Sequence, residues 1–277
     1  MTGLVLTAAR RSELAALLDD EQRLRSEYPV VADYLDTAPR LPGTGDEAVD
    51  ATFDLRLLHY MTGGESESGN PYWDIIAPFV SVKDGRRVVD GGRPRGCARL
   101  AYAQTILQAA YAYAIPSAET VRWIGEFAKG RRVLELGAGR GYWARLLDSA
   151  GIDVRAYDLE PPDSSSNASF PRVAGSVDVW HSVGNLAQFG DESLSDGVLL
   201  LCWPPGWGDP MASTALKKFE AGGGRRLVYI GEPRGGKTGD EPFFERLEEA
   251  WTPDGADERF VSWWNLNDSA RGWVRRE

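Results

Sequence analysis

Three glycines follow a short apolar run in the middle of the chain and could bring the backbone against a ligand. The run Val133–Leu136 is predicted to be a buried strand, and Gly137, Gly139 and Gly141 come directly after it. Glycine can turn sharply, adopt positive φ and approach a ligand without a Cβ in the way. A strand that ends in such a loop is typical of folds that bind a nucleoside-containing cofactor.

A carboxylate lies where it could hold the ribose of such a cofactor. The next predicted strand, 152–157, alternates apolar and polar residues and is closed by Asp158, 21 residues after Gly137. An acidic residue at about this distance reaches a bound ribose diol in dinucleotide-binding folds. Glu160 is a substitute for this role, and the alternative for Asp158 is a turn carboxylate at a strand end.

The segment Arg131–Asp158 resembles motifs I and II of the class I S-adenosylmethionine (SAM) dependent methyltransferases. The resemblance implies that the glycine loop passes under the methionine part of SAM and that Asp158 grips the ribose hydroxyls. It places Glu135 near the amino end of SAM. It also places Asn185, as a neutral substitute for the more usual Asp, on the adenine amino group. The alternative for Asn185 is a turn residue.

A nicotinamide-binding Rossmann domain is the nearest competitor. Its fingerprint G-x-G-x-x-G needs a small residue at position 142, where this chain has Tyr142. A tyrosine there would obstruct the close helix–strand packing that the third glycine allows. The glycine loop alone leaves both cofactors open, whereas Asp158 and the later strands favour SAM.

The order of elements predicts an α/β fold. Strands are expected at 131–136, 152–157, 179–183, 196–202 and 226–231, and helices at 120–129, 141–149, 210–221 and 241–250. This alternation indicates a parallel sheet with right-handed crossovers. Two closing strands, 259–265 and 271–276, predict a terminal antiparallel hairpin. The methyltransferase resemblance implies the same plan, a seven-stranded Rossmann-like sheet.

The chain before this domain is predicted to be a mainly helical N-terminal extension, with domains at 1–115 and 116–277. Helices are expected at 8–37 (kinked or broken at Pro29), 50–61 and 95–114, and 37–50 is expected to be a loop. Trp73–Val80 and Val88–Val89 would flank a hairpin turn at 83–86. The connection 159–173 has a composition typical of disorder. We expect the extension to be a lid or a substrate-specificity module.

The loop after the fourth strand should border the active site, because ligands of open α/β sheets bind outside the carboxyl ends of the strands. Trp203-Pro-Pro resembles the Asn/Asp-Pro-Pro-aromatic motif of amino-group methyltransferases. In that motif, the polar side chain and the first proline's carbonyl accept hydrogen bonds from the target nitrogen. The resemblance implies a catalytic contact for Pro204 and substrate contacts for Trp203, Pro205 and Trp207. Because a tryptophan replaces the polar residue, N-methylation is only slightly favoured; the alternative is a rigid turn with core tryptophans.

Three more side chains are candidates for the site. His181, in the predicted third strand, could be a general base, although a strand position favours packing. Glu232 follows the fifth strand at the same edge and is a second catalytic candidate. Tyr113 could cover the sulfonium of SAM with its ring face, or pack between helices.

The segment Gly231–Thr238 matches the P-loop pattern G-x-x-x-x-G-K-[ST] and follows a strand. In a P-loop, the helix begins at the Lys-Thr pair, so that its N-terminus faces the phosphates. Here Asp240 and Pro242 predict a later helix start. We therefore expect a mobile substrate loop.

Composition limits the partners. There are 31 basic and 41 acidic residues, and the net charge of −10 argues against a nucleic-acid partner. Cys97 and Cys202 are too few for a disulfide scaffold or a zinc site, so no metal is expected. The stretch Leu100–Val121 is too polar for a membrane span, and no signal-peptide profile is seen at the N-terminus. We expect a cytoplasmic protein with no membrane partner.

Together these patterns predict a SAM-dependent methyltransferase that acts on a small-molecule or peptide acceptor, with a role in specialised metabolism. The tryptophans near predicted loops favour a partly apolar, aromatic or amine-bearing acceptor. The alternatives are an NAD(P)-dependent oxidoreductase, a catalytically silent SAM-binding protein and a nucleotide hydrolase. The oligomeric state stays open, with a homodimer as one option.

Overall fold

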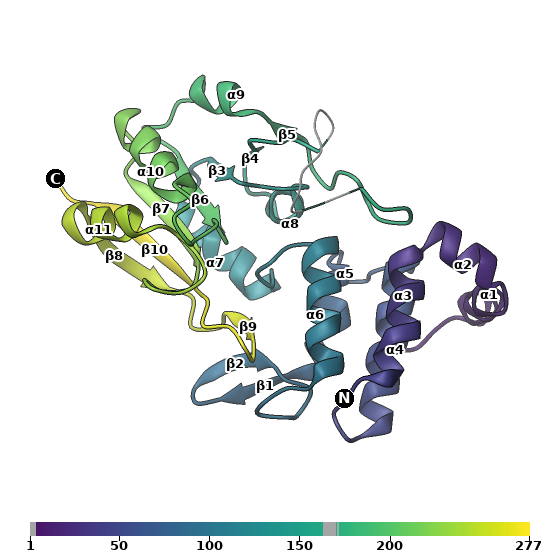
Figure 1. Cartoon of the computed structure of the whole chain (residues 1–277). Helices are drawn as coiled ribbons and strands as arrows, with labels where there is room; N and C mark the ends of the chain where they lie inside the picture. Colours follow the sequence, from purple (N-terminus) through teal and green to yellow (C-terminus); the bar gives the residue numbers. More distant parts are fainter. Residues whose placement is uncertain (1–3, 163–169, 171) are drawn as a thin grey trace. The chain divides into compact units, whose positions relative to one another are not determined.

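The computed structural model describes residues 4–162, 170 and 172–277, and the chain forms two compact units (Figure 1). The first unit comprises Met1–Tyr111, Pro171–Asp178 and Trp263–Asn265, and the second comprises Ala112–Phe170, Val179–Ser262 and Leu266–Glu277. Most of the connection predicted at 159–173 lies outside the described residues.

The first unit is mainly helical. Its helices are α1 (Ala8–Asp19), α2 (Glu21–Glu27), α3 (Pro29–Thr37), α4 (Glu47–Met61), α5 (Pro71–Ile76) and α6 (Ala98–Ala110), with 3-10 turns η1 (Ala38–Arg40) and η2 (Ala77–Phe79). The predicted break at Pro29 is confirmed, because Pro29 opens α3 where its missing N–H costs nothing. A second break was not predicted: Asp20 caps α2 by accepting the N–H of Arg23 at 2.9 Å.

The hairpin of the first unit is confirmed, but the segment that leads into it is helical. β1 (Val80–Lys83) pairs with β2 (Arg86–Val89) across Asp84 and Gly85, and both turn residues have positive φ, as a two-residue turn of this kind requires. The residues from 73 to 76, predicted as strand, are helical. The reason is local: Asn70 accepts the N–H of Trp73 at 3.1 Å and a proline follows it at the start of α5.

A seven-stranded sheet forms the centre of the second unit, in the order β5-β4-β3-β6-β7-β10-β8. Its strands are β3 (Val133–Leu136), β4 (Val154–Tyr157), β5 (Val183–Gly184), β6 (Val198–Cys202), β7 (Arg226–Gly231), β8 (Trp251–Ala256) and β10 (Ser269–Arg275). β3 to β7 pair in parallel, whereas β10 is antiparallel to both β7 and β8. The predicted α/β class and seven-stranded sheet with a terminal antiparallel pair are confirmed.

Two strand predictions in this unit are wrong in detail. The antiparallel partner of β10 is β8, not the segment 259–265, of which only β9 (Val261–Trp263) is a strand, outside this sheet. Pro253 hid β8 from prediction, because proline is tolerated only where a strand has a free edge, as β8 has. The third strand starts at Val183, so His181 precedes it instead of lying within it.

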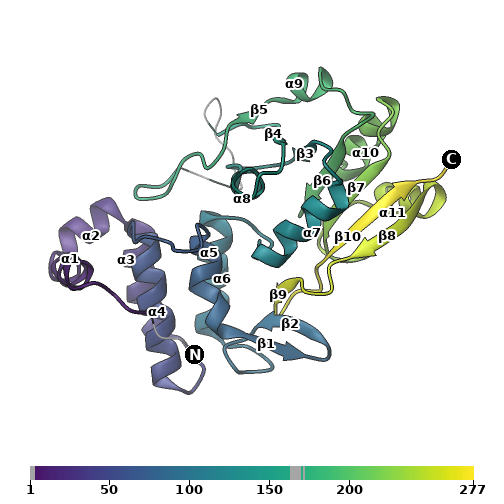
Figure 2. The same cartoon turned by 180° about the vertical axis from the view of Figure 1, so that it is seen from behind.

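Helices cover both faces of the sheet. α7 (Ala118–Ala128) and α8 (Tyr142–Ser149) lie on one face, and α10 (Met211–Ala221) and α11 (Glu241–Ala250) lie on the other (Figures 1 and 2). The second face is closed by a core that includes Leu199, Leu216 and Phe243. The short α9 (Leu186–Gly190) follows β5. The loops that leave β3, β4, β6 and β7 therefore meet at one edge of the sheet, where a ligand is expected.

Candidate active site

The three glycines after β3 adopt the conformation for which they were singled out. Their φ angles are 80° at Gly137, 54° at Gly139 and 76° at Gly141. At Gly139 a Cβ would lie 2.5 Å from Cε2 of Phe170, so the ring of Phe170 contacts the loop backbone. A side chain at this position is excluded by φ and by lack of space.

Asp158 contacts the glycine loop directly. Its Oδ2 accepts the N–H of Gly139 at 2.8 Å, and its Oδ1 accepts the N–H of Glu160 at 2.9 Å. Burial raises the pKa of Asp158, while these backbone donors oppose the rise. Both carboxylate oxygens therefore accept backbone donors from the loops that leave β3 and β4.

Glu135 is an enclosed carboxyl group with a missing partner. The residue is only 2% exposed, and its Oε2 has no hydrogen-bond partner. Burial raises the pKa of Glu135 to about 8, the backbone N–H of Ala144 opposes this shift, and the charge of Asp158 adds to it. An unsatisfied buried polar atom costs about 1–3 kcal/mol. A cationic donor placed at Oε2 would remove that cost and favour the ionised acid.

The loop after β6 is fixed by backbone bonds. Trp203 donates its N–H to the carbonyl of Ile230 at 2.7 Å, and the Pro204 carbonyl accepts the N–H of Gly239 at 3.1 Å. Pro205 forms an isolated bridge with Thr238. The Pro204 carbonyl, which the resemblance aims at a target nitrogen, thus already has one donor, and its second lone pair is available.

Trp207 ends this loop as an exposed aromatic side chain. Its side chain is 85% exposed and its φ is 52°, a conformation that is uncommon for any residue except glycine. Packing within the chain does not explain why a tryptophan is exposed in a left-handed conformation on this loop.

Aromatic rings connect the glycine loop with the loop after β6. The ring of Tyr113 stacks on Trp203 with centroids 5.8 Å apart and an interplanar angle of 14°. Its edge also meets Phe170 at 5.9 Å, and Phe170 in turn contacts Gly139. We call Tyr113, Phe170 and Trp203 the aromatic wall. Sequence reasoning missed Phe170, because it follows a polar segment with no periodic pattern.

Both oxygens of Glu232 are engaged with backbone donors. Oε2 accepts the N–H of Lys237 at 2.7 Å, and Oε1 accepts the N–H of Asn267 at 3.0 Å. The Glu232 N–H donates to the buried hydroxyl of Thr238 at 2.8 Å. α11 starts at Glu241, so Lys237 and Thr238 do not open a helix and the geometry of a P-loop is absent from this segment.

The last two predicted residues lie at either end of β5. Asn185 caps α9: its Oδ1 accepts the N–H groups of Ala187 and Gln188 at 2.9 and 3.1 Å, and the Gln188 side chain accepts the Asn185 N–H. His181 has its Nδ1 2.9 Å from the carbonyl of Ser182. A Cβ on Gly141 would lie 3.0 Å from the Cβ of His181, so the histidine packs against the glycine loop.

Sequence reasoning also missed Asp268, which precedes β10. Asp268 is 3% exposed; its Oδ2 accepts the indole N–H of Trp203 at 3.0 Å, and its Oδ1 accepts the hydroxyl of Ser262. An aspartate in a predicted hairpin turn carries no signal that would distinguish it from an ordinary turn residue.

The part of the chain that the structure describes holds no group of three His, Cys, Asp or Glu side chains arranged for a metal ion. None of the described helices is long and apolar enough to cross a membrane.

Comparison with known proteins finds similarity only among solved structures. No protein-family model matches the sequence, and no curated protein matches it significantly. Magnesium protoporphyrin IX methyltransferase from Synechocystis, with bound SAM, shows 13% identity over 57% of this chain and 79% of that chain, with a TM-score of 0.36. A TehB-like SAM-dependent methyltransferase from Corynebacterium glutamicum shows 22% identity over 64% and 97%, with a TM-score of 0.35. A mutant of MtNAS covers 99% and 100% at 11% identity, with a TM-score of 0.36. These values are too low to assign an activity.

Proposed function

We propose that the second unit is a class I SAM-dependent methyltransferase domain that acts on a small-molecule or peptide acceptor, in specialised metabolism. The observation that carries the proposal is Glu135, an enclosed carboxyl group with an unpartnered oxygen beside a loop of left-handed glycines. The ammonium group of the methionine part of SAM is a cationic donor of the required kind. Asp158, directly after the neighbouring strand β4, would accept the ribose hydroxyls.

The remaining cofactor contacts would come from the same edge. Gly137, Gly139 and Gly141, with their positive φ angles, would form the loop that passes under the methionine part, and the ring face of Tyr113 would cover the sulfonium. Asn185 would meet the adenine. Because its Oδ1 caps α9, we expect its side-chain NH₂ group to donate to a ring nitrogen.

SAM supplies a methyl group that is already activated on a sulfonium, so the chain has to align the acceptor and exclude water. Alignment of this kind can contribute about 7–11 kcal/mol. The second lone pair of the Pro204 carbonyl would orient an N–H of the acceptor, which slightly favours N-methylation. Trp203, Pro205 and Trp207 would contact the acceptor. We keep His181 as a candidate general base.

Glu232 would act on the reaction through the loop that it holds. Its two carboxylate oxygens accept backbone N–H groups from 237 and 267, and this fixes the 232–238 segment beside the loop after β6. The mobile substrate loop expected from the sequence is therefore proposed as a fixed wall of the acceptor site.

The nicotinamide alternative is disfavoured by packing. Tyr142, at the position that needs a small residue, is 1% exposed and packs edge-on against Trp180 at 5.0 Å. A side chain of this size at the start of α8 excludes the close helix–strand contact that a glycine allows in a dinucleotide site.

Calorimetric titration with S-adenosylhomocysteine (SAH) tests the cofactor assignment. We expect one binding site, and Asp158→Ala should weaken binding by about tenfold to a hundredfold, as loss of a charged hydrogen bond does. The matched control is Asp254→Ala, a half-exposed acid on β8 whose partner is Arg226, and this change should leave affinity unchanged. No binding by the wild-type protein would overturn the proposal.

Methyl transfer is tested with labelled SAM and a metabolite extract from the host. A labelled product that depends on the protein supports the enzyme. Tight SAH binding without transfer to any extract component would instead identify a silent SAM-binding protein.

A further inference from the structure

Trp203 stands where amino-group methyltransferases carry a polar acceptor, and the structure shows what holds its ring. The indole N–H donates to Oδ2 of Asp268 at 3.0 Å. Asp268 is almost completely buried, and its other oxygen accepts the hydroxyl of Ser262. The carboxyl group is therefore fixed on one side by the serine and fixes the indole on the other.

The backbone of Trp203 is fixed as well. Its φ is 53°, in the left-handed region that costs a residue with a Cβ about 1–2 kcal/mol. Its N–H is bonded to the Ile230 carbonyl at 2.7 Å. Strained conformations of this type persist only where the surroundings over-determine them, and they cluster at ligand sites.

The ring that is held in this way belongs to the aromatic wall. Trp203 stacks on Tyr113 at an angle of 14°, and Tyr113 is 37% exposed. Through Phe170 the wall reaches Gly139, where we place the cofactor. Ring contacts thus connect the glycine loop with position 203, where the amino-methyltransferase pattern has a polar side chain.

We propose that Asp268 is a positioning residue that presents the Trp203 ring to the methyl acceptor, and that the acceptor is a planar aromatic or heteroaromatic ring oriented by stacking. This inference rests on the proposed function and names the substrate class of the same site. Tryptophan at position 203 removes the side-chain acceptor of the amino-methyltransferase pattern, and of the two acceptors in that pattern the Pro204 carbonyl remains. Stacking on an aromatic ring contributes about 0.5–1.5 kcal/mol beyond the buried area, and it fixes the plane of the substrate.

The substrate class is tested with two amines of matched length and charge, 2-phenylethylamine and 2-cyclohexylethylamine. Each is titrated by saturation-transfer NMR into the full chain saturated with SAH. The flat ring should bind about threefold to tenfold more tightly, which corresponds to the stacking contribution, although the saturated ring is more apolar. Equal or tighter binding of the saturated ring, or no binding of either amine when SAH binds, would overturn this inference but leave the proposed function standing. Failure of SAH to bind would overturn the proposed function together with it.

The role of Asp268 is tested by a double-mutant cycle with Asp268→Leu and Trp203→Phe. If the carboxyl acts through the indole N–H, Asp268→Leu should weaken 2-phenylethylamine binding about threefold or more in the wild-type background and have no further effect beside Trp203→Phe. Asp268→Asn should restore binding, because an amide oxygen can accept the indole N–H. SAH affinity should stay within about twofold throughout.

A merely structural role gives a different pattern. Asp268→Leu would then lower the unfolding midpoint and SAH affinity in both backgrounds, and that result would overturn the positioning role. Trp123→Phe on α7, where the indole stacks on Phe127, is the control for changing a tryptophan elsewhere. If Asp268→Leu does not fold, Asp268→Asn is compared with Trp203→Phe. The inference is supported if the preference for 2-phenylethylamine over 2-cyclohexylethylamine is lost only in Trp203→Phe. It is overturned if both variants keep that preference.

Discussion

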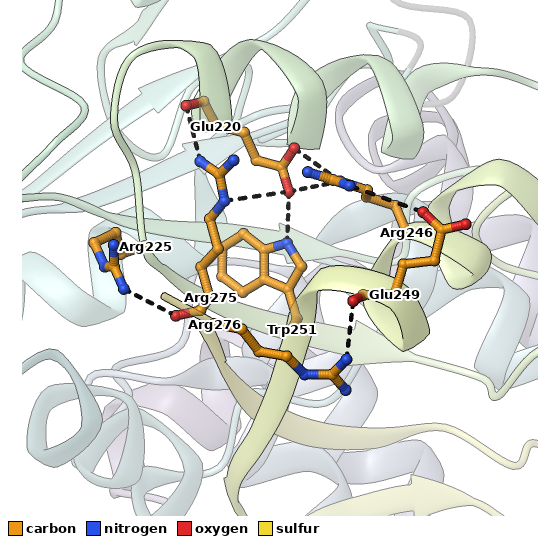
Figure 3. Close-up of polar contacts among 7 residues, drawn as sticks. All are labelled: Glu220, Arg225, Arg246, Glu249, Trp251, Arg275 and Arg276. Carbon is orange, nitrogen blue, oxygen red and sulfur yellow. Dashed lines mark hydrogen bonds and ion pairs between the residues drawn. The ribbon is translucent and has the colours of Figure 1, made fainter.

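Two glutamates of the second unit, Glu135 in β3 and Glu220 near the end of α10, are both largely enclosed but have different surroundings. Where β3 ends, Glu135 has an oxygen with no partner. Where β10 ends, Glu220 is surrounded by donors (Figure 3). The Nε of Arg246 lies 3.0 Å from both of its oxygens, and the indole N–H of Trp251 donates to Oε1 at 2.7 Å.

The contacts around Glu220 continue through the backbone. Arg275 lies 3.9 Å from the carboxylate and donates to the Glu220 carbonyl at 3.2 Å. Arg225 donates to the carbonyl of Arg275, and Arg276 donates to that of Glu249 (Figure 3). A carboxylate with complete partners fixes the ends of two helices and two strands. A carboxyl group of the same type with a missing partner is instead suited to a ligand.

The comparison can be broken by replacing each of the two carboxyl groups with an amide. Glu135→Gln should weaken SAH binding about tenfold to a hundredfold, because a bond to a charged group is lost, and should not destabilise the free protein. Glu220→Gln should cost about 1–2 kcal/mol of unfolding free energy and leave SAH binding unchanged. Calorimetry and urea unfolding measure both quantities. Equal changes in SAH affinity and in unfolding free energy for the two variants would contradict the distinction between a ligand-binding and a structural glutamate.

The pKa of Glu135 sharpens the same comparison. The pKa is about 8 in the folded chain against 4.5 in the unfolded chain, so the folded state binds this proton more tightly. The stability that the group contributes below pH 4.5 is lost progressively as the pH rises from 4.5 to about 8. If cofactor binding ionises Glu135, SAH affinity should rise by up to about tenfold per pH unit from about pH 6 to pH 8, with release of a proton. Titrations in buffers of different ionisation enthalpy detect that proton. In Glu135→Gln the pH dependence of stability and that of SAH affinity should both disappear. If they persist, another group is responsible for them.

Glycine at 139 gives a smaller effect with a clear control. Gly139→Ala should lose about 2–3 kcal/mol of unfolding free energy, from the left-handed φ and the contact with Phe170, and should also weaken SAH binding. Gly151→Ala has a similar φ of 78° and nothing within 4 Å of its Cβ, so it should lose only about 1–2 kcal/mol and keep its affinity. Chemical denaturation of both variants separates the cost of the left-handed φ from the cost of the contact with Phe170.

Trp207 should give the smallest change in stability. Trp207→Ala should alter the unfolding free energy by less than about 0.5 kcal/mol, and Trp207→Gly should be about 1 kcal/mol more stable than Trp207→Ala because the left-handed cost is relieved. Neither variant should change SAH affinity, but both should raise the KM for the acceptor found in the extract. An unchanged KM would remove Trp207 from the acceptor site.

Local signals in the sequence were sufficient to single out the glycine loop and Asp158. The glycine spacing and the position of Asp158 depend on residues within one strand–loop–helix–strand unit, and the structure joins them through the bond from Gly139 to Asp158. The N-cap of α7 is equally local: Ser117 accepts the N–H of Thr120, three residues later, at 3.2 Å.

The remaining features depend on contacts between distant segments. Asp268 meets Trp203 65 positions away, so no spacing rule could connect them. β8 pairs with β10 although it contains a proline, because its edge position tolerates a missing donor. Glu135 was singled out by resemblance alone, and the lack of a partner for its oxygen can be seen only in three dimensions.

A crystal structure of the chain with SAH tests the central claim most directly. We predict the amino nitrogen of SAH within hydrogen-bond distance of Oε2 of Glu135 and the ribose hydroxyls on Asp158. Crystals grown at saturating SAH that show no ligand at the glycine loop, or a ligand there with Glu135 still unpartnered, would contradict it.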